Sequence, residues 1–200
     1  MNATSLCFFL ISVTYTIGWT TISSELAYYK GLFGPSILLE LNLAYFLPSI
    51  PILLLQTWLD EHFDRKFGPG KATAFRFSFG LGGILGVSLA YPLLPEHRAP
   101  ILACVALLGV ASGILFGSSY QLVSRFPTHN TVALTLGYVA SGPLVLLLNF
   151  VLGIGPHATL WQRTALFASV TIVVVAGNLN EQCVAFVDAH AALLMHAAIC

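Results

Sequence analysis

Apolar residues along this chain are grouped into long stretches that contain no charged side chain. The charge-free runs cover residues 1–24, 41–59, 77–95, 99–124, 126–162 and 164–180. A helix needs about 20 mostly apolar residues to cross the hydrocarbon core of a bilayer. The run over 126–162 has a proline and polar residues near each end, so it holds one span. We therefore predict six membrane-spanning helices, over about 6–21, 36–59, 77–94, 100–124, 132–152 and 164–180.

This pattern predicts an all-α fold, a polytopic membrane protein with one bundle of six transmembrane helices over residues 1–187. The segment after Glu181 is too short and too interrupted to cross the bilayer. We expect residues 188–200 to form a short C-terminal tail.

Composition and charge then exclude several classes of protein. The 200 residues include 8 Lys+Arg and 8 Asp+Glu, and 57% are hydrophobic. An ordinary soluble domain is about 25% charged, so a soluble enzyme and a disordered protein are excluded. No basic patch, nucleotide-binding loop, metal-type Cys/His spacing or intramembrane acid–base pair is found. We therefore expect no nucleic-acid partner, cofactor, metal site or catalytic residue.

The basic residues predict an orientation in the membrane. Arg65, Lys66, Lys71 and Arg76 lie in the charged segment 60–76, which we expect to be a loop, and Arg125 follows the fourth span. The other side holds Lys30, Arg98 and Arg163. Because cytoplasmic loops carry the excess of Lys and Arg, both termini are predicted to be cytoplasmic. Which membrane holds the protein is left open.

Two predicted spans carry small residues at every fourth position, which places them on one helix face where backbones can approach closely. These residues are Gly109, Gly113 and Gly117, and then Ala133, Gly137 and Ser141. The third span adds Gly82 and Gly86. The faces predict contact between protein helices, either static or sliding. We expect Gly142 to belong to the same contacts. We expect Ser141-Gly142-Pro143 to break the hydrogen-bond ladder of the fifth span, as is common in transporters.

Polar and aromatic residues inside the spans are the candidates for a solute pathway, because such residues usually face a cavity or a partner. Glu40 lies near the start of the second span and can either reach the membrane surface or face a pathway, with Lys30 as a neighbour. Asn149 lies deep in the fifth span, as a bridge between helices or as a solute contact. Trp19 ends the first span, where it can anchor the helix at the interface or stack on a flat solute.

The segment Val110–Val145 resembles the fourth and fifth helices of the equilibrative nucleoside transporters. It reads VASGILFGSSYQLVSRFPTHNTVALTLGYVASGPLV, and the positions that fit the family's pattern are Gly117, Ser118, Phe126, Pro127, Thr131, Gly137 and Gly142. The segment LNLAYFLPSIPILLL is similar to the family's second helix. The spacing of Trp19 and Tyr28 is similar to that in its first helix. The resemblance covers the first five spans.

The resemblance implies passage of a nucleoside or nucleobase by alternating access, with Trp19 stacking on the solute. Phe116 and Tyr138 stand where the family has glutamines, and the resemblance implies that they line or block the pathway. The family has about eleven helices in a major-facilitator-like architecture, of which this chain matches the first half. A second six-helix half or a homodimer partner is therefore expected. The alternative is a truncated, non-transporting membrane protein that acts as a scaffold or regulatory partner.

Overall fold

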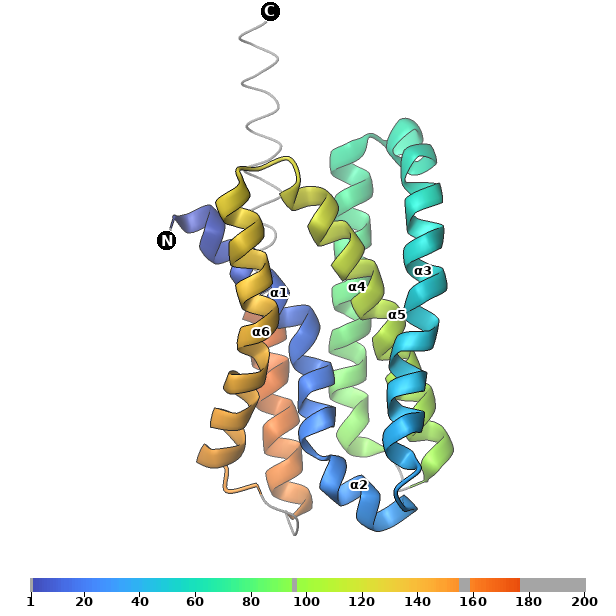
Figure 1. The fold of residues 1–200 in the computed structure, drawn as a ribbon, viewed down its shortest axis with the longest axis vertical. Helices are drawn as coiled ribbons and strands as arrows, with labels where there is room; N and C mark the ends of the chain where they lie inside the picture. Colours follow the sequence, from blue (N-terminus) through green and yellow to red (C-terminus); the bar gives the residue numbers. More distant parts are fainter. Residues whose placement is uncertain (1, 95–96, 155–158, 177–200) are drawn as a thin grey trace, which may run out of the picture.

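The structure, a computed structural model, describes residues 2–94, 97–154 and 159–176 and contains helices without any strand in those ranges (Figure 1). The elements are α1 (Ala3–Ser24), α2 (Leu26–Phe33), α3 (Ile37–Phe67), α4 (Pro69–Ala90), the 3₁₀ turn η1 (Tyr91–Leu93), α5 (Arg98–Val123) and α6 (Thr128–Val151). A further helix covers Leu160–Ala176. The all-α class predicted from the sequence is confirmed for the described residues.

Five of these helices are long and apolar enough to cross a membrane, which supports an integral, multi-pass membrane protein. They cover Ala3–Ser24, Ile37–Asp60, Gly70–Leu93, Arg98–Val123 and Thr128–Val151. The predicted sixth span, 164–180, overlaps an apolar helix whose described part is Leu160–Ala176. Residues 177–180 and the predicted tail over 188–200 lie outside the described residues.

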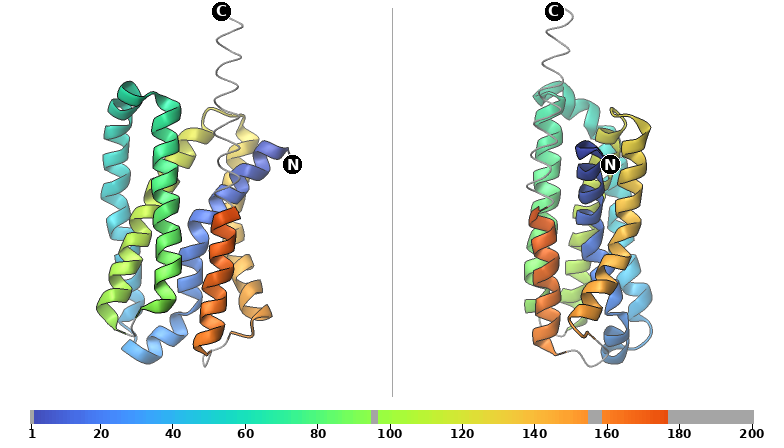
Figure 2. Two further views of the ribbon diagram at one scale, coloured as in Figure 1. Left: turned by 180° about the vertical axis from the view of Figure 1, so that it is seen from behind. Right: turned by 90° about the vertical axis from the view of Figure 1, so that its left-hand side faces the viewer.

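The long helices run side by side and alternate in direction, with α1 in the middle and α3 and α6 at the edges (Figure 1). Seen from behind, α4 and the 160–176 helix cover the opposite face (Figure 2). The α3–α4 turn and the α5–α6 connection lie at the end of the bundle that holds the N-terminus, called here the N-terminal end. The short helix α2 lies at the other end, called here the α2 end.

Helix α1 is buried although it is rich in serine and threonine. Its hydroxyl groups donate to the carbonyl four residues earlier: Thr14 to Leu10 at 2.8 Å, Thr16 to Ser12 at 2.7 Å and Thr21 to Ile17 at 2.7 Å. These bonds satisfy the hydroxyls without a partner on another helix, so the small side chains can be buried in an apolar bundle. The sequence therefore places a small-residue helix in the centre of the protein.

The prediction that residues 60–76 form a charged loop is wrong. Helix α3 continues to Phe67 and α4 begins at Pro69, so the turn is essentially Gly68, with φ of 83°. Glycine adopts this backbone conformation without steric cost, and proline suits the first turn of a helix. The charged residues of this region therefore lie on the ends of two antiparallel helices.

Helix α6 continues through Pro143, so the predicted break in the hydrogen-bond ladder at Ser141-Gly142-Pro143 does not end the helix. The proline removes one backbone donor, while the Ser141 hydroxyl donates to the Tyr138 carbonyl at 2.9 Å. The helix tolerates the loss of one backbone bond and keeps the rest of its ladder.

Candidate solute pathway

The glycine face of α5 lies against α3 and brings the two backbones together. A Cβ atom on Gly109 would overlap the carbonyl of Tyr45, and one on Gly113 would lie 3.5 Å from Ser49. A Cβ atom on Gly117 would overlap the amide of Gln56. The expected backbone-to-backbone contact is thus found between α5 and α3.

Side-chain hydrogen bonds follow the same α3–α5 contact. The Ser49 hydroxyl lies 2.8 Å from the Tyr45 carbonyl and 2.9 Å from the Gly109 carbonyl. The Gln56 amide donates to the Ser118 hydroxyl at 2.7 Å and to the Ile114 carbonyl at 3.2 Å. The contact is therefore polar as well as close.

Helix α6 makes the corresponding contact with α1. A Cβ atom on Gly137 would overlap the Phe9 carbonyl and lie 2.9 Å from the Ser12 Cβ atom. Ser141 and Ala133 of the same face are buried. At the N-terminal end of the bundle, the Ser5 hydroxyl donates to the Asn130 side-chain oxygen at 2.8 Å.

Three glycines differ from the expectation. A Cβ atom on Gly82, Gly86 or Gly142 would have no neighbouring atom within 4 Å in the described part of the chain. Gly142 precedes Pro143, where a proline ring crowds the Cβ atom of the preceding helical residue, which gives a local reason for glycine. In α4 the glycines against α5 are Gly80 and Gly83 instead.

Trp19 lies between α1 and α3 in an aromatic stack. Its ring is 4.3 Å from that of Tyr45 at an interplanar angle of 14°, and it meets the edge of Phe46 at 5.8 Å. One face of the indole is therefore occupied by Tyr45. This packing between helices is a third role for Trp19, different from the interfacial anchor and the solute contact predicted from the sequence.

Phe116 belongs to the same region, because its ring meets Tyr15 of α1 at 6.1 Å and Tyr120 at 4.6 Å. Tyr15 accepts a hydrogen bond from Ser12 at 3.1 Å. The residues that join α1, α3 and α5 through ring contacts are called here the aromatic cluster: Tyr15, Trp19, Tyr45, Phe46, Phe116 and Tyr120. Tyr138, on α6, is 49% exposed.

Glu40 and Asn149 have other surroundings. Glu40 accepts from Nε of Arg98 at 2.6 Å and forms an ion pair with the same guanidinium, which joins the first turns of α3 and α5. Its partner is thus Arg98 and not the neighbour expected from the sequence, Lys30. The Asn149 side-chain oxygen is buried without a hydrogen-bond partner in the described ranges.

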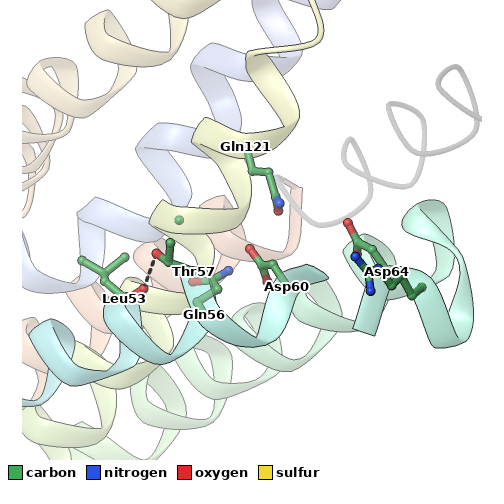
Figure 3. Close-up of a pocket in the computed structure, with 8 residues that line it drawn as sticks. Leu53, Gln56, Thr57, Asp60, Asp64 and Gln121 are labelled. Atoms are coloured by element: carbon green, nitrogen blue, oxygen red, sulfur yellow. Dashed lines mark hydrogen bonds between the residues drawn. The ribbon is translucent and has the colours of Figure 1, made fainter. Parts of the chain in front are cut away.

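A polar cavity of about 710 Å³ opens between α3 and α5 at the N-terminal end (Figure 3). It is lined by Leu53, Gln56, Thr57, Asp60, Asp64, Arg65, Gly117 and Gln121. The side chains of Gln56 and Asp60 come from α3, and the Gln121 amide points toward Asp60 from α5 (Figure 3). The cavity lies at the end of the α3–α5 contact, next to Gly117.

Arg76 of α4 forms ion pairs with Asp60 and Asp64, the two acidic residues that line this cavity. One guanidinium nitrogen lies 2.8 Å from Asp64 and 3.0 Å from Asp60, and the other donates to the Gln121 side-chain oxygen at 2.8 Å. The Arg76 guanidinium therefore partly neutralises the two carboxylates and also binds the side-chain amide of Gln121. The wall offers both hydrogen-bond acceptors and donors to a polar molecule.

This cavity was not predicted from the sequence, because Asp60, Asp64 and Arg76 lie in the segment 60–76, which was expected to be a loop. A signal was present: Gln56, Asp60 and Asp64 recur every four residues, which places them on one helix face. Gly117 and Gln121 have the same spacing on α5. Comparison with models of known families and with curated proteins found no match for this chain.

Proposed function

We propose that this protein is one half of a membrane transporter that passes a small polar solute, of the nucleoside or nucleobase type, by alternating access. The observation that carries the proposal is the continuous α3–α5 contact. It runs from the polar cavity past Gln56, Ser49 and Tyr45 to the ring of Trp19. Polar side chains inside a membrane-spanning contact usually face a pathway or a partner, and in this proposal the pathway opens along the α3–α5 contact.

In this proposal the helix 160–176 is part of a sixth span, and both termini are cytoplasmic. A second six-helix bundle supplies the other wall of the pathway. The exposed apolar side chains of the two edge helices support this arrangement. On α3 these include Leu43, Leu47 and Leu54, and on α6 they include Val139, Leu146 and Phe150.

The chemistry of the proposed pathway suits a flat solute with hydrogen-bonding edges. Aromatic rings bind the faces of bases by stacking, which contributes about 1–3 kcal/mol per base. The carboxylates and amides of the cavity bind hydroxyl and amino groups. Closure of the site requires rocking of the bundle against its partner, without ATP.

Uptake of radiolabelled uridine and adenine by proteoliposomes that contain the purified chain tests the proposal. We expect saturable uptake that Trp19→Ala lowers about tenfold, the effect of a loss of about 1.4 kcal/mol. Trp58→Ala is the matched control, because Trp58 is 77% exposed on α3 and should leave uptake unchanged. Equal losses of uptake in both variants contradict a stacking role of Trp19, and uptake no greater than that of protein-free liposomes contradicts a pathway built from copies of this chain.

A non-transporting scaffold or regulatory partner is the second candidate, and one observation favours it. Trp19 already stacks on Tyr45, so one face of the ring expected to bind a solute is covered by the protein itself. A scaffold requires only the exposed faces of α3 and α6. Binding to another membrane protein without any uptake would support this candidate.

A further inference from the structure

Helix α4 lies at the back of the bundle (Figure 2), and one of its faces carries a row of exposed side chains that have no role in the proposed pathway. Lys71, Phe75 and Phe79 follow one another at every fourth position, which places them on one side of the helix. The two rings are 64% and 60% exposed and stack with centroids 6.3 Å apart. This face therefore combines a cation with a pair of aromatic rings.

The end of α3 adds a second cation and a second pair of rings next to the turn at Gly68. The Lys66 ammonium lies 5.3 Å from the centre of the Phe67 ring, and the Phe63 and Phe67 rings are 5.8 Å apart. Both of these rings are exposed. The exposed cations and rings on the two sides of the turn are called here the α3–α4 tip: Phe63, Lys66, Phe67, Lys71, Phe75 and Phe79.

The two lysines of the α3–α4 tip are not neutralised by a described carboxylate. Asp60 and Asp64, the nearest acidic residues whose side chains the structure describes, both form ion pairs with Arg76. Neither Lys66 nor Lys71 forms an ion pair with a described residue. The tip is therefore an exposed positive surface, and the partner that complements its charge is an anion.

The depth of the tip in the membrane identifies this anion as a lipid headgroup. The apolar part of α4 begins at Gly70, so Lys71 lies at the edge of the span and Phe75 lies about one turn deeper. Aromatic side chains are enriched at this level of a bilayer, and lysine side chains reach from it to the headgroups. Basic residues beside a span attract anionic lipids.

The same face of α4 continues toward the middle of the bilayer at Gly82 and Gly86. A Cβ atom on either glycine would have no atom of the described residues within 4 Å, so the face is open there. From Lys71 to Gly86 the helix rises about 22 Å. One leaflet, with half of the hydrocarbon core and one headgroup region, measures about 20–22 Å. The face is therefore as long as one lipid molecule.

We propose that the α3–α4 tip binds one anionic phospholipid of the leaflet at the N-terminal end. The Lys66 and Lys71 ammonium groups donate hydrogen bonds to its phosphate, and one acyl chain lies along Phe75 and Phe79 toward the glycines. The partner is a lipid because the surface that continues from the cations is apolar and exposed. The proposal requires that α3 and α4 cross the membrane, and it is independent of whether the protein transports a solute.

Lipid titration of the full chain, purified in dodecyl maltoside, tests this proposal. Bound phosphatidylglycerol is counted by native mass spectrometry, and phosphatidylcholine with the same acyl chains is the neutral comparison. We expect one phosphatidylglycerol per chain, bound about 25-fold more weakly by the double variant Lys66→Gln/Lys71→Gln, or about fivefold for each lysine. Lys30→Gln removes an exposed lysine at the α2 end and should leave binding unchanged.

Equal binding of the two lipids, or equal losses in the double variant and in Lys30→Gln, would overturn the proposal. The conservative variant Lys66→Arg/Lys71→Arg should still bind phosphatidylglycerol, because arginine also donates to phosphate. Loss of binding in that variant would contradict recognition by charge.

Thermal unfolding distinguishes a lipid from a soluble anion. At a phosphatidylglycerol concentration ten times the dissociation constant, the melting temperature of the wild type should rise by about 3–6 °C. Inorganic phosphate should give no rise, because it has no acyl chain to fill the face of α4. Without lipid, the double variant should melt within about 1 °C of the wild type, which shows that it is folded. An equal rise with inorganic phosphate would contradict a lipid site.

Discussion

At the scale of single residues, glycine occurs in two different environments in this protein, at close helix contacts and on open helix faces. Gly109 and Gly137 allow two helix backbones to touch, and a Cβ atom at either position would meet a carbonyl of the facing helix. Gly86 faces open space on α4. Four-residue spacing therefore identifies a close contact on α5, where the whole face is small, but not on α4.

This difference predicts opposite effects of the same substitution. Gly109→Ala forces α3 away from α5 at Tyr45 and should lower the free energy of unfolding by about 1–3 kcal/mol, as overpacking does. Gly86→Ala is the control and should raise it by about 0.5–1 kcal/mol, because alanine favours a helix over glycine. Both are measured by reversible denaturation in detergent micelles. A rise for both variants would show that the α3–α5 contact is looser than described.

At the scale of helices, arginine side chains connect elements that are distant in sequence. Arg76 of α4 binds Asp60 and Asp64 of α3 and Gln121 of α5. Arg98 joins the starts of α5 and α3 through Glu40. Arg163 joins the helix 160–176 to Glu25. Each pair links neighbouring helices at one end of the bundle.

Arg76 has three partner side chains, on two neighbouring helices at the N-terminal end, and we expect Arg76→Gln to be strongly destabilising. The side chain is 11% exposed, and removal of one partner from a mostly buried ion pair costs about 3 kcal/mol. Lys71→Gln, at an exposed site on α4, should change the free energy of unfolding little. Addition of Asp60→Asn and Asp64→Asn to Arg76→Gln should recover part of the loss, since the carboxylates then need no cation.

Loss of the buried Glu25–Arg163 ion pair should destabilise the helix 160–176 locally. The exposed Glu40–Arg98 pair provides the control. Glu25→Gln leaves a buried guanidinium without its carboxylate, so hydrogen exchange of the helix 160–176 should accelerate more than tenfold. Glu40→Gln should have a small effect, because its partner Arg98 is 46% exposed and exposed pairs contribute less than about 1 kcal/mol. Equal acceleration in both variants would mean that burial does not distinguish the two pairs.

The position of most helices could be predicted from the sequence, because the length of an apolar run reflects the thickness of a bilayer. The described starts and ends of α1, α5 and α6 lie within a few residues of the predicted spans. The extension of α3 to Phe67 could not be predicted from charge alone. Asp60 and Asp64 are helical there because Arg76 neutralises them from another helix, and hydropathy contains no such information.

Only some residues of the aromatic cluster could be predicted from the sequence, because their contacts depend on how the helices pack. Trp19 could be selected by residue type, and Phe116 by its place in the segment that resembles a transporter family. Their contacts with Tyr45 and Tyr15 depend on how α1, α3 and α5 pack, which no periodicity reveals. Trp19 and Phe116 could therefore be predicted from the sequence, but the tyrosines that pack against them could not.

At the scale of the whole molecule, the helix with the most small hydroxyl residues is central and the leucine-rich helices are at the edges. Helix α1 is mostly buried, whereas α3 and α6, at the two edges of the bundle, expose large apolar side chains. In lipid, large apolar groups gain nothing by burial, while small residues pack well between helices. This arrangement leaves α3 and α6 free to contact lipid or a second bundle.

The alternating directions of the helices predict which positions share a side of the membrane. In a variant whose four cysteines are replaced by serine, single cysteines at Lys71 and Arg125 should label together with an impermeant thiol reagent. Cysteines at Lys30 and His97 should label together from the other side. Because Arg65, Lys66, Lys71, Arg76 and Arg125 lie at the N-terminal end, we expect that end to face the cytoplasm.

The two parts of this experiment test different statements. Lys71 and Arg125 label from the same side whenever α4 and α5 both cross the membrane, whichever way the protein is inserted. Labelling of these two positions from opposite sides would contradict the five-helix arrangement itself. Shared labelling from the outside would leave the fold intact. It would show that the basic residues at the N-terminal end do not set the orientation of this protein.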